Sequence, residues 1–469
     1  MSNRPTYIST RGTAPVLGFD DVLLTGLARD GGLYVPQTWP SLTPVDVQGL
    51  AGLDYWQAAT RILTPFVTGD VSENELAALA RDAYAGFDHA AVAPLSQIGA
   101  NEWILELYHG PTLAFKDLAL QLVGRLFDLV LAKRGERITV VGATSGDTGS
   151  AAIEACRDRD NVDIFMLHPA GRVSEVQRRQ MTTVQASNVH NIALDGTFDD
   201  CQAMVKALFA DHELRDRLHL SAVNSINWAR VAAQTVYYFT AAVSLDGPAR
   251  EVAFSVPTGN FGDVYAGYVA AKMGLPVERL VIATNVNDIL VRSLHSGRYE
   301  VAEVTPTMSP SMDIQVSSNF ERLLFDLHGR DGKVISALMS DLARSGAFDI
   351  DMGRVARDLS LFRAASVSED ETLETMAGIY QSTGSLIDPH TAVGIAAGRR
   401  EPPEASVPMV YLATAHPAKF PDAVERATGV RPALPARLAD LLERPERFDR
   451  LANEIATVKH YIESRTRAS

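Results

Sequence analysis

The sequence predicts an α/β protein with doubly wound, mostly parallel sheets in two domains, preceded by a mainly helical N-terminal domain. The first reason is an alternation that begins near residue 130, where short β-branched runs are separated by amphipathic helical stretches. That alternation is typical of a parallel sheet covered by helices on both faces. The second reason is that residues 1–95 lack it, because they are rich in turns and then helical.

Each predicted element follows from the local pattern of apolar residues. Helices are expected at 54–62, 73–83, 118–130, 151–157, 174–185, 199–208 and 264–272. Buried strands are expected at 138–141, 164–167, 189–193, 218–223, 252–256, 280–284 and 409–413. The helix at 264–272 has a clear end, with Gly274 after its last turn and Pro276 beyond. Residues 329–351 resemble surface helix and loop, and the Pro-rich 401–408 is a connector.

These elements divide the chain into three predicted domains. Residues 1–95 form the helical N-terminal domain, and residues 96–245 form an α/β domain with Lys116 and the SGDTG loop. Residues 246–469 form a second α/β domain with the GNFGD loop and the TAHPAKF segment. A chain of 469 residues, 46% hydrophobic and 21% charged, is long enough for several such domains.

The charge balance disfavours several function classes. Lys and Arg number 43 and Asp and Glu number 57, so the net charge is −14, which argues against a nucleic-acid or membrane partner. No apolar run is long enough to span a bilayer, and residues 1–5 lack the apolar core of a signal peptide. Two cysteines, Cys156 and Cys201, cannot form a disulfide framework, which fits a reducing cytoplasm. No metal site is expected.

The segment 108–117 (YHGPTLAFKD) places Lys116 in an apolar frame, just past a Gly-Pro turn and at the start of a helical pattern. A lysine there is partly desolvated, which disfavours the ammonium and frees a nucleophilic amine. Such amines form Schiff bases with carbonyl substrates and with pyridoxal phosphate. Taken alone, the segment is also compatible with a surface lysine that ends a turn.

Two strand-to-helix loops are rich in small and polar residues. The first is 142–150 (GATSGDTGS) and the second is 257–263 (PTGNFGD). Small residues let the backbone approach a ligand closely, and free N–H groups at a helix start bind anions. Either loop could also be a simple tight turn, and neither matches the dinucleotide or ATP phosphate-loop patterns. A single anionic aldehyde would explain all three features, with the lysine bound to the aldehyde and the loops bound to anionic groups. Pyridoxal phosphate is such a molecule.

A third loop, 411–420 (YLATAHPAKF), follows the last predicted strand. Ligands of doubly wound sheets sit at the C-terminal ends of strands, so this loop could reach the same crevice. Thr414 would be a neutral partner for the pyridine nitrogen of the cofactor, because a hydroxyl leaves that nitrogen unprotonated. A threonine at a strand end also serves purely structural roles.

With these residues in place, the chain resembles the threonine synthases, fold-type II pyridoxal-phosphate enzymes, in the branch found in fungi and many bacteria. The resemblance runs nearly end to end. The strings that carry it are YISTRG (7–12), GLARDGGLYVP (26–36), HGPTLAFKD (109–117), TSGDTG (144–149), GTFDDCQ (196–202), NSINWAR (224–230), GNFGD (259–263), SPSMDI (309–314), DPHT (388–391) and TAHPAKF (414–420).

The resemblance implies a role for each of these loops. Lys116 is implied to carry the cofactor and to shuttle protons as the catalytic residue. The implied cofactor-binding residues are Phe115, Lys116, Gly259, Asn260, Phe261, Gly262, Asp263 and Thr414. The loop that grips the substrate carboxylate and approaches the phenolic oxygen of the cofactor is Thr144, Ser145, Gly146, Asp147 and Thr148. Related fold-type II enzymes carry asparagine where Asp147 stands, and the aspartate is a feature of this branch.

The implied reaction converts O-phospho-L-homoserine and water into L-threonine and phosphate. The released phosphate is thought to help activate the water, so cations must hold it after it leaves. Arg230 and Lys419 are the candidate cations, and arginine suits bidentate phosphate binding. Further donors are Asn224, Ser225 and Asn227, and weaker candidates are Arg292, Arg322 and His390. Each could instead form a helix cap or an interdomain ion pair.

For Asp117 a structural role is favoured, since it lies in a first helical turn near the helix dipole. His109 either packs against the cofactor or hydrogen-bonds the turn, and the second reading is favoured. Two alternatives to a threonine synthase stay open. One is a phospholyase that stops after elimination and releases 2-oxobutyrate, and the other is a non-catalytic binding protein on the same scaffold. The branch suggests a monomer.

Overall fold

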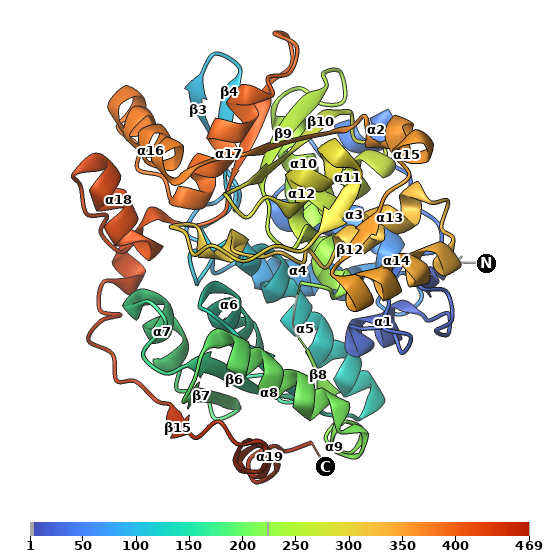
Figure 1. Ribbon diagram of the computed structural model, residues 1–469, viewed down its shortest axis with the longest axis vertical. Coiled ribbons are helices and arrows are strands. Elements are labelled where there is room, and N and C mark those ends of the chain that lie inside the picture. Colours follow the sequence, from blue (N-terminus) through green and yellow to red (C-terminus); the bar gives the residue numbers. More distant parts are fainter. Residues whose placement is uncertain (1–3, 223–224, 469) are drawn as a thin grey trace.

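The computed structural model describes residues 4–222 and 225–468, and two sheets form its frame (Figure 1). The larger sheet has the strand order β13-β10-β9-β14-β4-β3. Its strands are parallel except for β3, which is an antiparallel edge strand. The bounds are β3 Leu95–Gly99, β4 Glu102–Glu106, β9 Val252–Pro257, β10 Val277–Thr284, β13 Phe362–Ser366 and β14 Met409–Ala413.

The smaller sheet is parallel throughout, in the order β15-β7-β6-β5-β8. Its strands are β5 Ile138–Ala143, β6 Val162–Pro169, β7 Val189–Leu194, β8 Leu220–Ser221 and β15 Asp449–Leu451. Every residue of β6 is buried. A central parallel strand covered on both faces has this property, which is why most of its residues are apolar.

Helices cover both faces of each sheet. On the larger sheet, α17 (Pro389–Arg400) packs on one face, while α11 (Gly262–Lys272) packs on the other, backed by α10 (Trp228–Ser244). On the smaller sheet, α8 (Phe198–Ala210) and α19 (Ile455–Glu463) cover one face, while α6 (Asp147–Cys156) lies on the other beneath α5 (Lys116–Arg134). The predicted doubly wound, mostly parallel architecture is therefore confirmed.

The N-terminal part is mainly helical, as predicted. It contains the antiparallel pair β1 (Tyr7–Ser9) and β2 (Tyr34–Pro36), with α1 (Phe19–Thr25), α2 (Pro44–Gln48), α3 (Tyr55–Val67) and α4 (Glu73–Tyr84). Its apolar side chains belong to the same core cluster as those of α5 and α10.

The two sheets exchange strands across the predicted domain boundaries. β4, from the range 96–245, lies in the larger sheet, and β15, from the range 246–469, lies in the smaller one. The division into 1–95, 96–245 and 246–469 therefore stays a prediction.

The remaining elements connect these layers. They are α7 Glu175–Thr182, α9 His212–Arg217, α12 Ile289–Ser296, α13 Phe320–Leu327, α14 Gly332–Ser345, α15 Met352–Leu359, α16 Glu369–Thr383, α18 Pro421–Thr428, β11 Arg298–Glu300, β12 Ala347–Asp349, and the 3-10 turns η1 Pro310–Met312, η2 Pro417–Lys419 and η3 Ala436–Leu438.

Several elements differ from their prediction in extent. The strand expected at 218–223 is only β8, because α9 ends at Arg217 and Leu218 caps it; position 223 lies outside the described residues. The helix expected at 174–185 ends at Thr182. The sequence pattern did not reveal the remaining strands, which are β1, β2, β3, β4, β11, β12, β13 and β15. Among them, β11 and β12 pair with each other in a small antiparallel sheet.

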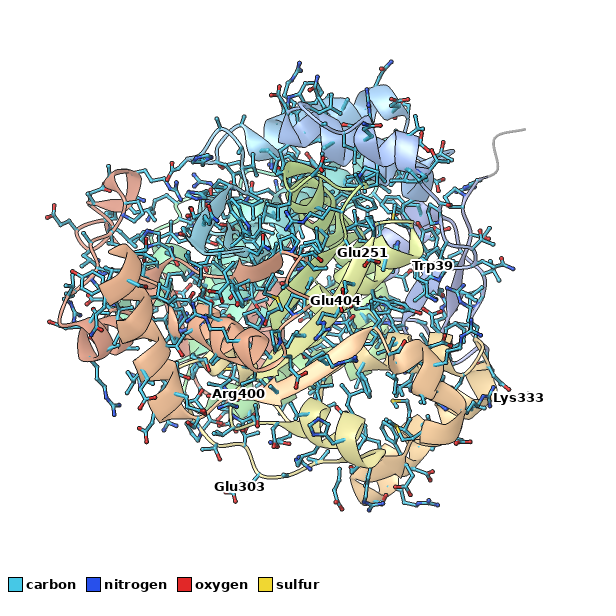
Figure 2. All side chains as sticks on the ribbon, turned by 90° about the horizontal axis from the view of Figure 1, so that it is seen from above. Trp39, Glu251, Glu303, Lys333, Arg400 and Glu404 are labelled. Carbon is cyan, nitrogen blue, oxygen red and sulfur yellow. The ribbon has the colours of Figure 1, made fainter. Side chains whose placement is uncertain are left out.

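Charged side chains extend outward from this frame. Figure 2 shows Lys333 and Glu303 projecting away from the ribbon, and both are exposed. Among residues 4–222 and 225–468, no helix is both long and apolar enough to cross a membrane.

The crossing of α5 and α6 depends on a close backbone approach. A Cβ at Gly124 in α5 would lie 2.3 Å from the carbonyl oxygen of Ala155 in α6. We expect Gly124→Ala to lower the free energy of unfolding by about 1–3 kcal/mol, because the helices must move apart. Gly378→Ala in α16 is the matched control, since its added Cβ would have no heavy atom of the described residues within 4 Å outside the adjoining turns of its own helix. Equal shifts in the denaturation of both variants would contradict the proposed close packing.

Candidate active site

The candidate site lies where the C-terminal ends of strands from both sheets meet. Asp147 begins α6, just after β5, and the Gly259 loop follows β9. Thr414 follows β14, and its carbonyl oxygen accepts a hydrogen bond of 2.8 Å from the backbone N–H of Phe115. That bond places the end of β14 beside Lys116, the first residue of α5. Ligands of doubly wound sheets bind at this kind of edge.

Lys116 is buried, with a side chain that is only 9% exposed. Its Nζ lies 3.5 Å from Oδ2 of Asp147 and 5.0 Å from the centre of the Phe115 ring. Burial lowers the pKa of Lys116, and Arg230 and Lys419 lower it further, while Asp147 opposes them. The surroundings therefore make the amine of Lys116 easier to deprotonate than that of an exposed lysine, which is the direction the sequence predicted.

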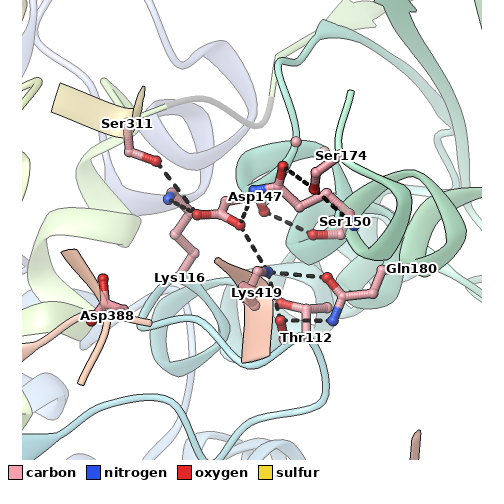
Figure 3. Close-up of polar contacts among 12 residues, drawn as sticks. Thr112, Lys116, Asp147, Ser150, Ser174, Gln180, Ser311, Asp388 and Lys419 are labelled. Atoms are coloured by element: carbon pink, nitrogen blue, oxygen red, sulfur yellow. Dashed lines mark hydrogen bonds and ion pairs between the residues drawn. The ribbon is translucent and has the colours of Figure 1, made fainter. Parts of the chain in front are cut away.

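Four side chains contact the carboxylate of Asp147 (Figure 3). Its Oδ1 lies 2.8 Å from Nζ of Lys419 and accepts a hydrogen bond of 2.8 Å from Nε2 of Gln177. Its Oδ2 faces Lys116 and accepts a longer bond of 3.4 Å from Oγ of Ser311. Burial raises the pKa of Asp147, but Lys419 and Lys116 outweigh it and hold the pKa well below its usual value. The group is a carboxylate.

The loop before Asp147 is held in shape by its own side chains. Oγ1 of Thr144 accepts hydrogen bonds of 2.9 Å from the backbone N–H groups of Gly146 and Gly149. Gly146 has φ +153°, and a Cβ there would lie 2.5 Å from the Gln177 amide, so this position requires glycine. Thr144 was predicted to bind substrate, but its hydroxyl oxygen accepts hydrogen bonds that stabilise the loop. Ser145 is exposed and Thr148 is half-buried.

The segment 309–314 connects the two loops. The backbone oxygen of Ser311 occupies the space beside Gly259, where a Cβ would approach it to 2.5 Å. The backbone N–H of Ser311 donates a bond of 3.3 Å to Nε2 of His390, whose Nδ1 lies 2.8 Å from Oδ1 of Asp388. His390, a weaker candidate for phosphate binding, therefore anchors this segment.

The Gly259 loop turns into α11 through Phe261, which has φ +64°. Asn319 fixes the loop, since its backbone N–H and its side chain both donate to the carbonyl oxygen of Asn260. The ring of Phe261 is buried against Phe320 and Phe362. Phe261, predicted to bind the cofactor, thus has a side chain in the core, and only its backbone is at the loop.

Arg230 is a buried cation. Its Nη1 is buried and has no hydrogen-bond partner among residues 4–222 and 225–468. Burial lowers the pKa of Arg230 to about 10. Asp263 is also buried: Tyr237 and Tyr238 donate to its Oδ1 at 2.5 Å and 2.9 Å, and burial raises its pKa to about 6. A buried guanidinium with a free donor is suited to an anionic ligand.

Lys419 lies beside Asp147, but unlike Arg230 its ammonium is fully bonded to protein acceptors. Nζ donates to the carbonyl oxygen of Thr112 at 2.7 Å and to Oε1 of Gln180 at 3.0 Å, in addition to Asp147. Its three donors are therefore used. This arrangement does not support the predicted contact of Lys419 with a substrate phosphate.

The other residues predicted to bind the substrate phosphate differ in their contacts. Asn227 caps α10, accepting from the N–H of Ala229, and donates to Leu23. Ser225 lies in the turn before α10, and Asn224 lies outside the described residues. Arg292 pairs with Asp288 and bonds Gln315, and Arg322 is buried among carbonyl oxygens of Tyr34 and Ile226.

Asp117 and His109 both contact protein groups, and their expected structural roles stay predictions. Both oxygens of Asp117 accept bonds of 2.7 Å from Thr112, and His109 contacts Glu106 at 2.7 Å. Burial raises the pKa of Asp117 to about 6.

Sequence reasoning missed Gln177, Gln180 and Ser311 as site residues. The two glutamines lie three positions apart on α7, a spacing that puts them on one helix face, and both are buried. A polar pair on the buried face of a helix next to a predicted loop was the available signal.

Comparisons with known proteins agree with this geometry. The family profile described as pyridoxal-phosphate dependent enzyme matches residues 91–414, and the profiles of the threonine synthase N terminus and C-terminal part match residues 6–84 and 391–462. A threonine synthase of Pseudomonas aeruginosa is 58% identical over 457 residues, covering 97% of each chain.

Two solved structures match nearly the whole chain. The crystal structure of a PLP-bound threonine synthase from Brucella melitensis has a TM-score of 0.97 at 56% identity, covering 99% of this chain and 100% of its own. The yeast threonine synthase structure has a TM-score of 0.94 at 40% identity, covering 99% of each chain.

The fold and the buried lysine at the joined strand ends define a pyridoxal-phosphate-dependent enzyme of fold type II. Within that class, the matched profiles and the near-complete relatives identify the family: the chain belongs to the threonine synthases.

The residues present fit pyridoxal phosphate. Lys116 offers a desolvated amine for the aldehyde, and the Gly259 loop opens into the N-terminus of α11, where backbone N–H groups suit a phosphate. The backbone of this loop packs so closely on Ser311 that Gly259 has no room for a side chain. The unpartnered Nη1 of Arg230 supplies further anion-binding capacity in the described part of the chain.

We expect inorganic phosphate to stabilise the wild-type protein, because a ligand that binds only the folded state raises its stability. Arg230→Met is expected to weaken this stabilisation about tenfold in phosphate concentration, the cost of about one charged hydrogen bond. Thermal melts across a phosphate series provide the measurement. Arg344→Met, at an exposed arginine, is the control. An unchanged phosphate response in Arg230→Met would show that this guanidinium does not bind anions.

Proposed function

We propose that this protein converts O-phospho-L-homoserine and water into L-threonine and phosphate. The observation that carries the proposal is a buried amine, Lys116, beside a buried carboxylate and near a buried guanidinium with an unused donor among the described residues. The reaction needs a group that moves protons and a cation that holds phosphate, and these residues provide both. Bound at the site, pyridoxal phosphate supplies an aldehyde for amines and a ring that withdraws electrons from the substrate.

Lys116 is proposed to take protons from Cα and Cβ of the substrate and to return protons to Cγ and Cα. A proton carrier works best when its pKa lies near the working pH, and the lowered pKa of Lys116 favours this. The C–O bond from Cγ to phosphate breaks, and a C–O bond from Cβ to water forms.

Each loop is proposed to bind a different anionic group of the cofactor or the substrate. The cofactor phosphate is proposed to lie at the loop of Gly259, Asn260, Gly262 and Asp263, with Thr414 near the pyridine nitrogen. The substrate carboxylate is proposed to bind Ser145, Thr148 and the first N–H groups of α6. Asp147 is itself a carboxylate and would repel another, so we propose that it faces the cofactor and Lys116 instead.

The substrate phosphate is proposed to bind Arg230, with Ser225 as a neighbour. This proposal rests on the free donor of Arg230 and on the occupied donors of Lys419. We also propose that the protein acts as a cytoplasmic monomer. Its cysteines, Cys156 and Cys201, are free and buried, which fits a reducing compartment.

The proposed reaction can be separated from simple elimination by its products. We expect the protein with pyridoxal phosphate and O-phospho-L-homoserine to release phosphate and threonine in equal amounts. Phosphate matched by 2-oxobutyrate would instead indicate a phospholyase. Without any phosphate release, the protein would be a binding protein or act on another substrate.

Lys116→Ala is expected to abolish turnover, because the residue serves both as the anchor and as the acid–base group. General acid–base catalysis alone is typically worth about 10²–10⁴-fold in rate. The measurement is threonine formation at saturating substrate, with Lys333→Ala at an exposed lysine as the control. Near-normal activity in Lys116→Ala would refute its assigned role.

A further inference from the structure

Lys419 is a buried ammonium surrounded by the polypeptide. Its side chain has no exposed area, and its acceptors come from three elements: the turn before α5, α6 and α7. Gln180 also donates from Nε2 to the carbonyl oxygen of Thr112 at 3.0 Å, which ties two of these acceptors to each other. An ammonium has three N–H donors, so Lys419 is held on three sides and is directed at Asp147.

The two oxygens of Asp147 have different partners. Oδ1 receives Lys419 and Gln177, both at 2.8 Å, while Oδ2 faces Lys116 at 3.5 Å and Ser311 at 3.4 Å. The contact with Lys419 is therefore shorter than the contact with Lys116. The nearer cation therefore lies at Oδ1, the oxygen that does not face the reacting amine.

The charged groups that face Lys116 come from four elements. They are Asp147 on α6, Arg230 on α10, Asp263 on α11 and Lys419 at η2. Asp147 alone would favour the ammonium form of Lys116, since an opposite charge nearby stabilises the charged form. Lys419 disfavours the ammonium form of Lys116 in two ways. It repels that ammonium directly, and it balances part of the charge of Asp147.

We propose that Lys419 is a positioning residue that holds Asp147 through Oδ1, so that Lys116 has a shared counter-charge and its amine is free to react near neutral pH. This inference rests on the proposed role of Lys116 as the reacting amine. It replaces the role in substrate binding that the sequence suggested for Lys419. Lys419 touches neither the substrate nor the cofactor in this role.

The test measures the reactivity of Lys116 in cofactor-free protein. Pyridoxal, which lacks the phosphate, is added with cyanoborohydride across a pH series, and peptide mapping quantifies the labelled Lys116. In Lys419→Met we expect the pH midpoint of labelling to rise by about one unit or more, the effect of a single nearby charge in a buried site. The sign is upward because losing Lys419 favours the ammonium, which reacts only after deprotonation. Lys419→Arg keeps the charge and should lie near wild type.

Two further variants show whether the effect passes through Asp147. In an Asp147→Asn background, adding Lys419→Met should move the midpoint less than it does in wild type, because no carboxylate remains to be shared. Equal shifts in both backgrounds would overturn the proposal. Lys459→Met, at a lysine paired with Asp211 away from the site, should leave the midpoint unchanged.

If Lys419→Met does not fold, its thermal stability in an Asp147→Asn background tests the proposal. The proposal then expects Asp147→Asn to restore thermal stability to Lys419→Met, because the unbalanced carboxylate is removed, and no rescue would overturn it. Wild-type protein with no labelling of Lys116 at any pH would refute both this inference and the proposed function. Normal labelling with an unmoved midpoint in Lys419→Met, together with a loss of substrate affinity, would refute only this inference.

Discussion

A carboxylate buried between two lysine side chains is the interaction on which the site depends. Asp147 has little contact with solvent, and a buried charge is stable only when it is paired and hydrogen-bonded. Its partners come from α5, α7, η1 and η2, which lie far apart along the chain. Satisfying this one group therefore fixes the relative positions of several elements that carry the site.

The second constraint is the close packing of Ser311 against both loops. Its backbone oxygen lies beside Gly259, its hydroxyl reaches Asp147, and its N–H bonds His390. These contacts join the loop of the larger sheet to the loop of the smaller one. A displacement of the segment 309–314 would disturb both anion-binding loops together, because they share one neighbour.

The sequence predicted the parts that local patterns encode. The alternation of strands and helices, the two glycine loops and Lys116 were all visible, because burial and backbone geometry leave a short-range signature. What side chains do within those loops was not visible. Thr144 and Asn227 look like ligands in the sequence, but their oxygens accept backbone hydrogen bonds nearby. Gln180 and Ser311 were missed because their partners lie far along the chain, and tertiary packing alone brings them together.

The last strand has a consequence for how the chain matures. β15 pairs with β7, which precedes it by more than two hundred residues, and α19 then covers the sheet. A ribosome that has released only the first 448 residues presents β7 as an open edge, and such edges attract other strands. The smaller sheet, which positions Asp147, is therefore completed only after residues 449–451 have been synthesised. Until then the nascent chain needs protection from aggregation more than the finished protein does.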